Sequence, residues 1–138
     1  MPRDYHVLPG VPWDTLGAIS AGGVLGALAR YGIQSAYPMP ASGFDWPTFW
    51  INASGCFLIG IVIVFATESG RAHRLLRPFL ATGVLGGFTT FSTYVVGMQR
   101  ELAAGAPRTA LAYGAGTALA ALAAAWAGVR LGNRLVLR

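Results

Sequence analysis

Long apolar stretches alternate with short polar connectors along the chain. Four stretches carry almost no charge, and they run over residues 15–36, 49–67, 78–99 and 109–129. About 20 helical residues cross the hydrocarbon core of a bilayer, so each stretch is long enough to span it. Three short connectors lie between them: 37–46, 68–77 and 100–108. We therefore predict an all-α integral membrane protein, with residues 1–138 forming a single four-helix transmembrane domain.

The composition supports this class and disfavours several others. Hydrophobic residues make up 54% of the 138 residues and charged residues only 11%, whereas a soluble domain carries about 25% charge. The net charge is +5, and all ten basic residues are arginines, of which all but Arg30 lie outside the apolar stretches. This arrangement favours anionic lipid over nucleic acid as a partner. Soluble enzymes, nucleic-acid-binding modules and disordered tails are all disfavoured.

Function in a membrane protein is best sought among the polar residues inside the spans, because such residues are costly in lipid. The four stretches contain no Asp, Glu, Lys or His, and their one charged residue is Arg30. A proton-coupled exporter needs a titratable group, whereas a guanidinium stays protonated. The sequence also lacks a His, Cys and carboxylate cluster for catalysis or a transition metal. Enzymes and proton-driven pumps are disfavoured.

Neutral hydrogen-bonding side chains remain inside or beside the spans. Thr48 and Asn52 lie one helical turn apart at the start of the second span. Asn52 fits either an ion path or a hydrogen bond between helices. Tyr113 and Thr117 have the same spacing in the last span. For that pair simple packing is favoured, because a threonine can bond back to its own helix.

The third span contains an unusual segment, GGFTTFSTY, over residues 86–94. Adjacent glycines and a run of hydroxyl residues are poor helix formers, so we expect a break near the membrane midplane. Unpaired backbone groups at that depth must face protein, water or an ion. Carbonyl oxygens would suit Na⁺, and hydroxyl or amide donors and aromatic edges would suit an anion. A kinked packing helix is the alternative.

Three motifs resemble the Fluc (CrcB) family of fluoride channels. The first span contains GGxxGAxxRY over residues 22–31, and the second contains TxxxNxxGCFxxG over residues 48–60. The third contains GGxTTFST over residues 86–93. All three occur in the order and at the spacing of the family, and the GGxTTFST motif is very specific.

The resemblance implies four transmembrane helices in an antiparallel dimer, with the third helix broken near the midplane. It also implies a structural, non-transported Na⁺ held by backbone carbonyls of both subunits, which carry over to Gly86 and Thr89. Arg30 matches an arginine at the end of the first helix, where an anchoring or anion-attracting role fits. The fluoride pore residues carry over to Asn52, Phe91, Tyr94, Thr48, Ser92, Thr93, Tyr113 and Thr117.

The implied activity is a passive pore that lets cytoplasmic fluoride leave down its electrochemical gradient. Such a pore needs no proton coupling, which agrees with the missing intramembrane carboxylate. Two positions depart from the family pattern: Tyr94 replaces a second phenylalanine, and Gly97 stands where many members have a glutamate. A non-conducting membrane scaffold and a small four-helix exporter are the alternatives.

The arginines are unevenly divided between the two sides of the predicted bundle. The side with both termini carries seven: Arg3, Arg71, Arg74, Arg77, Arg130, Arg134 and Arg138. The other side carries Arg100, Arg108 and at most Arg30. The positive-inside rule then predicts cytoplasmic termini in the cell (plasma or inner) membrane. We expect a partner of the same family: a second copy inserted the opposite way, or an oppositely oriented homologue.

Overall fold

The computed structural model describes residues 12–68 and 74–136, and over these ranges it contains helices and no strand. The helices are α1 (Trp13–Ala36), α2 (Trp46–Glu68), the π-helix η1 (Pro78–Leu85), α3 (Gly86–Phe88), α4 (Phe91–Ala103) and α5 (Pro107–Val136). The segments η1, α3 and α4 together form one apolar span, Pro78–Ala103. With α1, α2 and α5 this makes four spans of membrane-crossing length. The predicted all-α, four-span class is confirmed.

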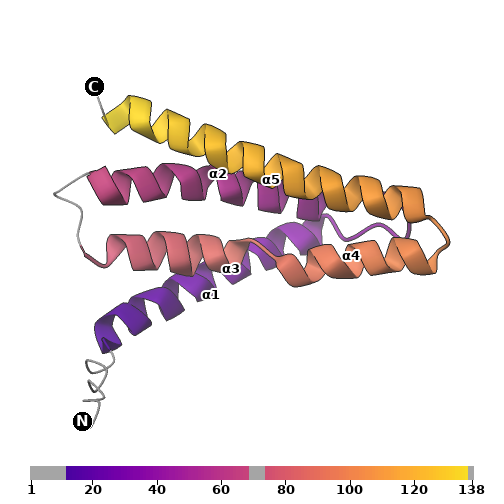
Figure 1. Ribbon diagram of the computed structural model, residues 1–138. Helices are drawn as coiled ribbons and strands as arrows, with labels where there is room; N and C mark the ends of the chain where they lie inside the picture. Colours follow the sequence, from indigo (N-terminus) through magenta and orange to yellow (C-terminus); the bar gives the residue numbers. More distant parts are fainter. Residues whose placement is uncertain (1–11, 69–73, 137–138) are drawn as a thin grey trace, which may run out of the picture.

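The spans form a bundle in which α5 runs along α2, while α1 crosses the segment made of η1 and α3 (Figure 1). The start of α1 and the end of α5 lie at one end of the bundle (Figure 1). The connectors 37–45 and 104–106 lie together at the opposite end (Figure 1). The broken third span therefore lies between its neighbours, with its break far from both ends.

Small residues allow the backbones to touch where the helices cross. A side chain added at Gly26 of α1 would collide with the Val84 carbonyl of η1. One added at Gly128 of α5 would collide with the Phe57 carbonyl of α2. Apolar surface alone does not drive association in lipid, so such close backbone contact helps to hold the helices together.

The predicted break in the third span is present at Thr89 and Thr90. Thr89 has φ −72° and ψ 157°, and Thr90 has φ −145° and ψ 121°, both extended conformations. Before the break, residues 78–85 form a π-helix, which the sequence did not predict. π-helical turns are rare and occur frequently at functional sites.

The span boundaries need correction at several ends. The last span was expected over 109–129, but α5 covers Pro107–Val136 and so includes three arginines. The third was expected to end at 99, but α4 continues to Ala103. A charge-free criterion stops at the first arginine, whereas helical hydrogen bonding continues through it and the long side chain reaches the interface. The connector 68–77 falls partly outside the described residues.

Candidate functional site

Asn52 of α2 bridges the break in the third span. Its Oδ1 accepts a hydrogen bond from the Thr90 N–H at 2.8 Å, and its Nδ2 donates to the Thr90 carbonyl at 3.0 Å. In a continuous helix this Thr90 N–H would bond to the Gly86 carbonyl. Asn52 therefore takes over a donor that the break released, and one of its two amide hydrogens remains for another partner.

Thr90 caps the helix that follows the break. Its Oγ1 accepts a hydrogen bond from the Thr93 N–H at 3.2 Å and donates one to the Thr93 hydroxyl at 3.0 Å. The Ser92 hydroxyl is also within hydrogen-bond distance of Thr90 Oγ1, at 3.3 Å. A continuous helix would direct the Thr93 N–H to the Thr89 carbonyl. The carbonyls of Gly86 and Thr89 have thus both lost their regular helical donors. Unwound carbonyls of this kind suit Na⁺, so the two residues fit the expected cation chemistry.

Arg30 reaches the same break from α1. Its Nε donates to the Gly87 carbonyl at 3.1 Å, although the two residues are 57 positions apart in the chain. The guanidinium therefore satisfies a carbonyl beside Gly86. The anchoring and anion-attracting roles inferred for Arg30 stay predictions.

A hollow of about 300 Å³ lies beside the break, between α2, α4 and α5. Four of the predicted pore residues line it, and Phe91 is 77% exposed, so one side of the hollow is open in the single chain. We call it the polar groove, and its lining is Asn52, Cys56, Thr89, Thr90, Phe91, Tyr94, Thr117, Ala118 and Ala121. Thr48, Ser92, Thr93 and Tyr113 are not among its lining residues.

Tyr94 presents its ring and its hydroxyl to different neighbours. The hydroxyl donates to the Gly114 carbonyl of α5 at 2.9 Å. The ring centroid lies 5.7 Å from that of Phe91 and 5.6 Å from that of Tyr113. The extra hydroxyl of this position is therefore used in helix packing, and the ring lines the polar groove.

Two buried hydroxyls on α5 are left without hydrogen bonds. Tyr113 is 1% exposed and Thr117 is 3% exposed. The Thr117 hydroxyl has no hydrogen-bond partner among the described residues, and the Tyr113 hydroxyl has the Thr48 side chain near it but forms no well-aligned hydrogen bond. A buried hydroxyl without a partner costs about 1–3 kcal/mol, so water or an ion is expected to satisfy it. The packing interpretation that the sequence favoured leaves these groups unexplained.

The absence of a side chain at Gly97 lets the Tyr113 ring pack directly against the α4 backbone. A Cβ placed on Gly97 would lie 2.9 Å from Cε1 and 3.3 Å from the hydroxyl of Tyr113. The position where many family members have a glutamate is therefore covered here by a tyrosine ring. This departure from the family pattern brings α4 and α5 into close contact.

Sequence reasoning missed a cluster of buried charges at the connector end of the bundle. Asp45 is 1% exposed and Glu101 is 2% exposed, and Arg100 pairs with Glu101 at 3.1 Å. All three lie in the predicted connectors, whereas candidate functional residues were sought among the polar residues inside the spans. One signal was available, because an aspartate three residues before Thr48 is typical of a helix N-cap. Asp45 Oδ1 does accept from the Thr48 N–H, at 3.1 Å.

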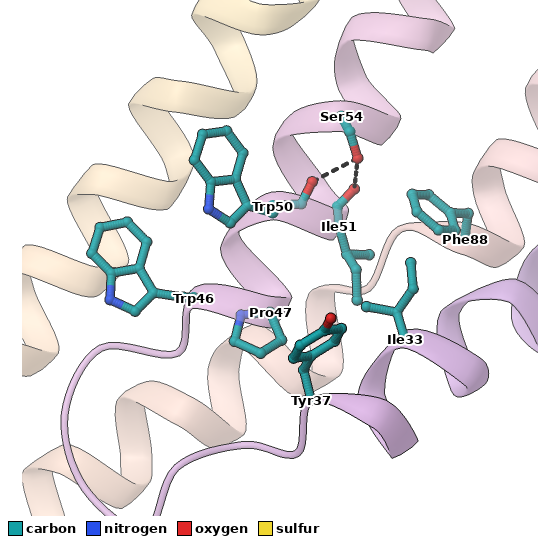
Figure 2. A pocket seen from close by; sticks show the side chains of 8 residues that line it. All are labelled: Ile33, Tyr37, Trp46, Pro47, Trp50, Ile51, Ser54 and Phe88. Carbon is teal, nitrogen blue, oxygen red and sulfur yellow. Dashed lines mark hydrogen bonds between the residues drawn. The ribbon is translucent and has the colours of Figure 1, made fainter.

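A second hollow, of about 350 Å³, lies between α1 and α2 (Figure 2). Its lining is mostly apolar: Ile33, Tyr37, Trp46, Pro47, Trp50, Ile51, Ser54 and Phe88. Ser54 donates to the carbonyls of Trp50 and Ile51 at 2.6 and 3.3 Å (Figure 2). Because this hydroxyl is bonded within its own helix, the hollow is poorly suited to an ion.

The chain is similar to known proteins over most of its length. Residues 17–129 match the family described as CrcB-like protein, Camphor Resistance (CrcB). "Fluoride-specific ion channel FluC 1" of Streptomyces coelicolor is 55% identical over 108 residues, which are 78% of this chain and 70% of that protein. "Fluoride-specific ion channel FluC 2" of Streptomyces avermitilis is 54% identical over 99 residues, which are 72% of this chain and 63% of that protein. "Fluoride-specific ion channel FluC 3" of the same organism is 40% identical over 123 residues, which are 89% of this chain and 60% of that protein. Both Streptomyces avermitilis proteins are thus matched over less than two thirds of their length.

Proposed function

The chain belongs to the CrcB-like family, and we propose that it is a passive, fluoride-selective channel. It is a multi-pass membrane protein and not an enzyme. The observation that carries the proposal is the polar groove at the helix break. Hydrogen-bond donors and aromatic rings line it, and no residue among its lining carries a charge at neutral pH.

The groove offers what a small, strongly hydrated anion needs. Dehydrating fluoride is costly, and donors at close range offset that cost. Asn52 has a free amide hydrogen beside the groove, and the Thr117 hydroxyl is buried without a partner. The rings of Phe91 and Tyr94 carry a partial positive charge at their edges, which attracts an anion.

Passive export follows from the chemistry of the groove. Hydrogen fluoride crosses membranes as a neutral acid and ionises in a less acidic cytoplasm, where the anion is trapped. No Asp, Glu, His, Lys or Arg is among the residues that line the groove. Fluoride would therefore move down its electrochemical gradient without a coupled proton.

A dimer would complete the site. The groove is open on one side and Phe91 is exposed there, so a second subunit would supply the missing wall. The carbonyls of Gly86 and Thr89 would hold a structural Na⁺ together with those of the partner. When bound, this Na⁺ would supply positive charge to the carbonyls that the break has deprived of donors. Asn52 and Arg30 satisfy their neighbours Thr90 and Gly87 and leave these two carbonyls for the ion.

The partner would be a second copy inserted the opposite way or an oppositely oriented homologue. The arginine asymmetry favours the homologue, because dual insertion calls for a nearly balanced count. Two matched relatives, FluC 2 and FluC 3, come from one organism, which supports the existence of paired homologues.

Fluoride efflux from liposomes tests the proposal. Purified protein, with its partner subunit where one is required, is reconstituted into vesicles loaded with fluoride, and efflux is recorded with a fluoride electrode. We expect rapid fluoride efflux and no comparable chloride efflux from matched vesicles. Efflux no faster than from protein-free vesicles would contradict a channel and favour a non-conducting scaffold.

A further inference from the structure

One peptide group ties the α1–α2 connector to the end of α4. The Gly43 N–H donates to Glu101 Oε1 at 3.0 Å, and the Gly43 carbonyl accepts from Arg100 Nη2 at 3.1 Å. Gly43 has a φ of 95°, a left-handed conformation that favours glycine. Arg100 also donates to Glu101 Oε1, through Nε at 3.2 Å and Nη2 at 3.1 Å. The three residues form a closed hydrogen-bonded ring, which we call the latch.

The latch is buried, unlike an ordinary surface ion pair. The side chains of Arg100 and Glu101 are 22% and 3% exposed. Exposed pairs contribute little, but removal of one partner from a buried pair leaves an uncompensated charge and is strongly destabilising. Removal of either side chain of the pair should therefore disturb the position of the connector.

The residues that follow Gly43 contact two of the predicted pore residues, Tyr113 through its ring and Thr48 through its backbone N–H. The Phe44 ring meets the Tyr113 ring edge-on, with centroids 5.2 Å apart and planes at 88°. Asp45 caps α2 through the Thr48 N–H at 3.1 Å. The latch therefore fixes the two residues that pack against Tyr113 and Thr48.

We propose that Arg100 and Glu101 are positioning residues that, through Phe44 and Asp45, hold Tyr113 and Thr48 in place for ion conduction. This inference rests on the proposed channel function. It assigns a role to charges that lie outside the polar groove and that the family resemblance does not cover.

Electrostatics alone makes the opposite prediction for Glu101. A buried carboxylate near an anion path repels the anion, so its neutralisation would raise fluoride flux. The latch hypothesis predicts a fall, because Glu101→Gln loses the charge-assisted bonds to Arg100 and Gly43. The direction of the change therefore separates the two explanations.

Two substitutions at Glu101 test the latch in the liposome assay. Glu101→Gln removes the charge, and Glu101→Asp keeps the charge but shortens the reach. We expect each to lower fluoride efflux per reconstituted dimer by about tenfold, the size of effect that loss of a charge-assisted hydrogen bond produces. Unchanged or faster efflux in Glu101→Gln would overturn the proposal.

A matched pair of arginines provides the control. Arg100→Gln and Arg108→Gln remove the same charge at the same end of the bundle, but Arg108 is exposed and makes none of the latch contacts. We expect efflux to fall in Arg100→Gln and to stay at the parent level in Arg108→Gln. Equal losses in both would show a general charge effect and contradict the latch.

Coupling to Tyr113 distinguishes positioning from mere stability. If Glu101 acts through Tyr113, the effects of Glu101→Gln and Tyr113→Phe on efflux will be less than additive, whereas a purely structural role predicts additivity.

Amide hydrogen exchange of the 39–45 connector gives a second readout, and the exchange should be faster in Glu101→Gln than in the parent. A parent that fails to conduct would refute the channel. A connector with unchanged exchange would refute the latch by itself.

Discussion

Asn52 shows how one residue can serve both the fold and the proposed pore. Both ends of its amide bond to Thr90, 38 positions away in the chain, and this bridges the break in the third span. One amide hydrogen is left beside the polar groove. A substitution at Asn52 therefore changes the support of the break and the chemistry of the groove together.

The first prediction concerns Asn52→Asp. The new carboxylate could still accept from the Thr90 N–H, but it would face the Thr90 carbonyl without a hydrogen to donate. It would also place a negative charge beside the groove. We expect fluoride efflux to fall to the level of protein-free vesicles, while gel filtration still shows a dimer. Ser54→Ala on the same helix is the control and should conduct like the parent, and unchanged efflux in Asn52→Asp would remove Asn52 from the pore.

The second prediction concerns Tyr94. Because its hydroxyl bonds to the Gly114 carbonyl, Tyr94→Phe should cost about 1 kcal/mol of stability and keep the ring in the groove. We expect fluoride efflux at least as fast as in the parent, measured in the same vesicles. Tyr94→Ile removes the aromatic edge and should conduct poorly. Loss of efflux in the phenylalanine variant would show that the hydroxyl itself is essential.

Contacts between elements explain why glycine is needed at some helical positions and not at others. Gly128 of α5 lies against the Phe57 carbonyl of α2, whereas a Cβ at Gly116 of α5 would have its nearest neighbour, the Phe44 ring, at 3.9 Å. Both glycines belong to a run of small residues spaced four apart in the sequence, Gly116, Ala120, Ala124 and Gly128. Only the packing of α5 on α2 separates them.

The third prediction uses this matched pair of glycines. Gly128→Ala should push α2 and α5 apart and cost about 1–3 kcal/mol, which is typical of overpacking. Gly116→Ala should be neutral or stabilising by up to about 1 kcal/mol, because alanine is the better helix former. Thermal loss of the folded protein, followed by gel filtration after heating, measures both. Equal melting temperatures for the two variants would contradict the close α2–α5 contact.

The whole molecule has a clear charge asymmetry between its two ends. Arg74 and Arg77 lie at the start of the third span, and Arg130 and Arg134 lie toward the end of α5, at the same end of the bundle. The end of α4, which carries Arg100, and the start of α5, which carries Arg108, lie at the other end (Figure 1). Three of the seven arginines assigned to this side from the sequence are outside the described residues: Arg3, Arg71 and Arg138. The arrangement of the described helices agrees with the two sides assigned from the sequence.

The fourth prediction is that the chain inserts in one orientation, with both termini in the cytoplasm. The positive-inside rule requires this when one side carries several more arginines than the other. A cysteine in the C-terminal tail, in a variant in which Cys56 is replaced, should resist a membrane-impermeant thiol reagent on intact cells. Labelling of about half of the molecules would show dual insertion and support a homodimer instead.

The sequence by itself determined the four spans and the place of the break, because both depend on local properties. Span length follows from the run of apolar residues, and the break follows from the poor helix propensity of Gly86, Gly87 and the hydroxyl residues after them. The motifs that resemble the family are likewise local patterns. The ends of the spans were misplaced: α1 and α2 begin at Trp13 and Trp46, earlier than expected, and the last two spans continue through arginines. The π-helix over 78–85 was not predicted.

The tertiary structure decided which polar groups meet, because each partnership joins residues that are distant in the chain. Arg30 and Gly87 are 57 positions apart, and Gly43 and Glu101 are 58 apart. Their contacts depend on how the helices cross, which no local pattern specifies. For the same reason the sequence assigned Arg100 and Glu101 to an exposed connector. The fold buries Glu101 and half-buries Arg100, and their ion pair compensates the buried carboxylate.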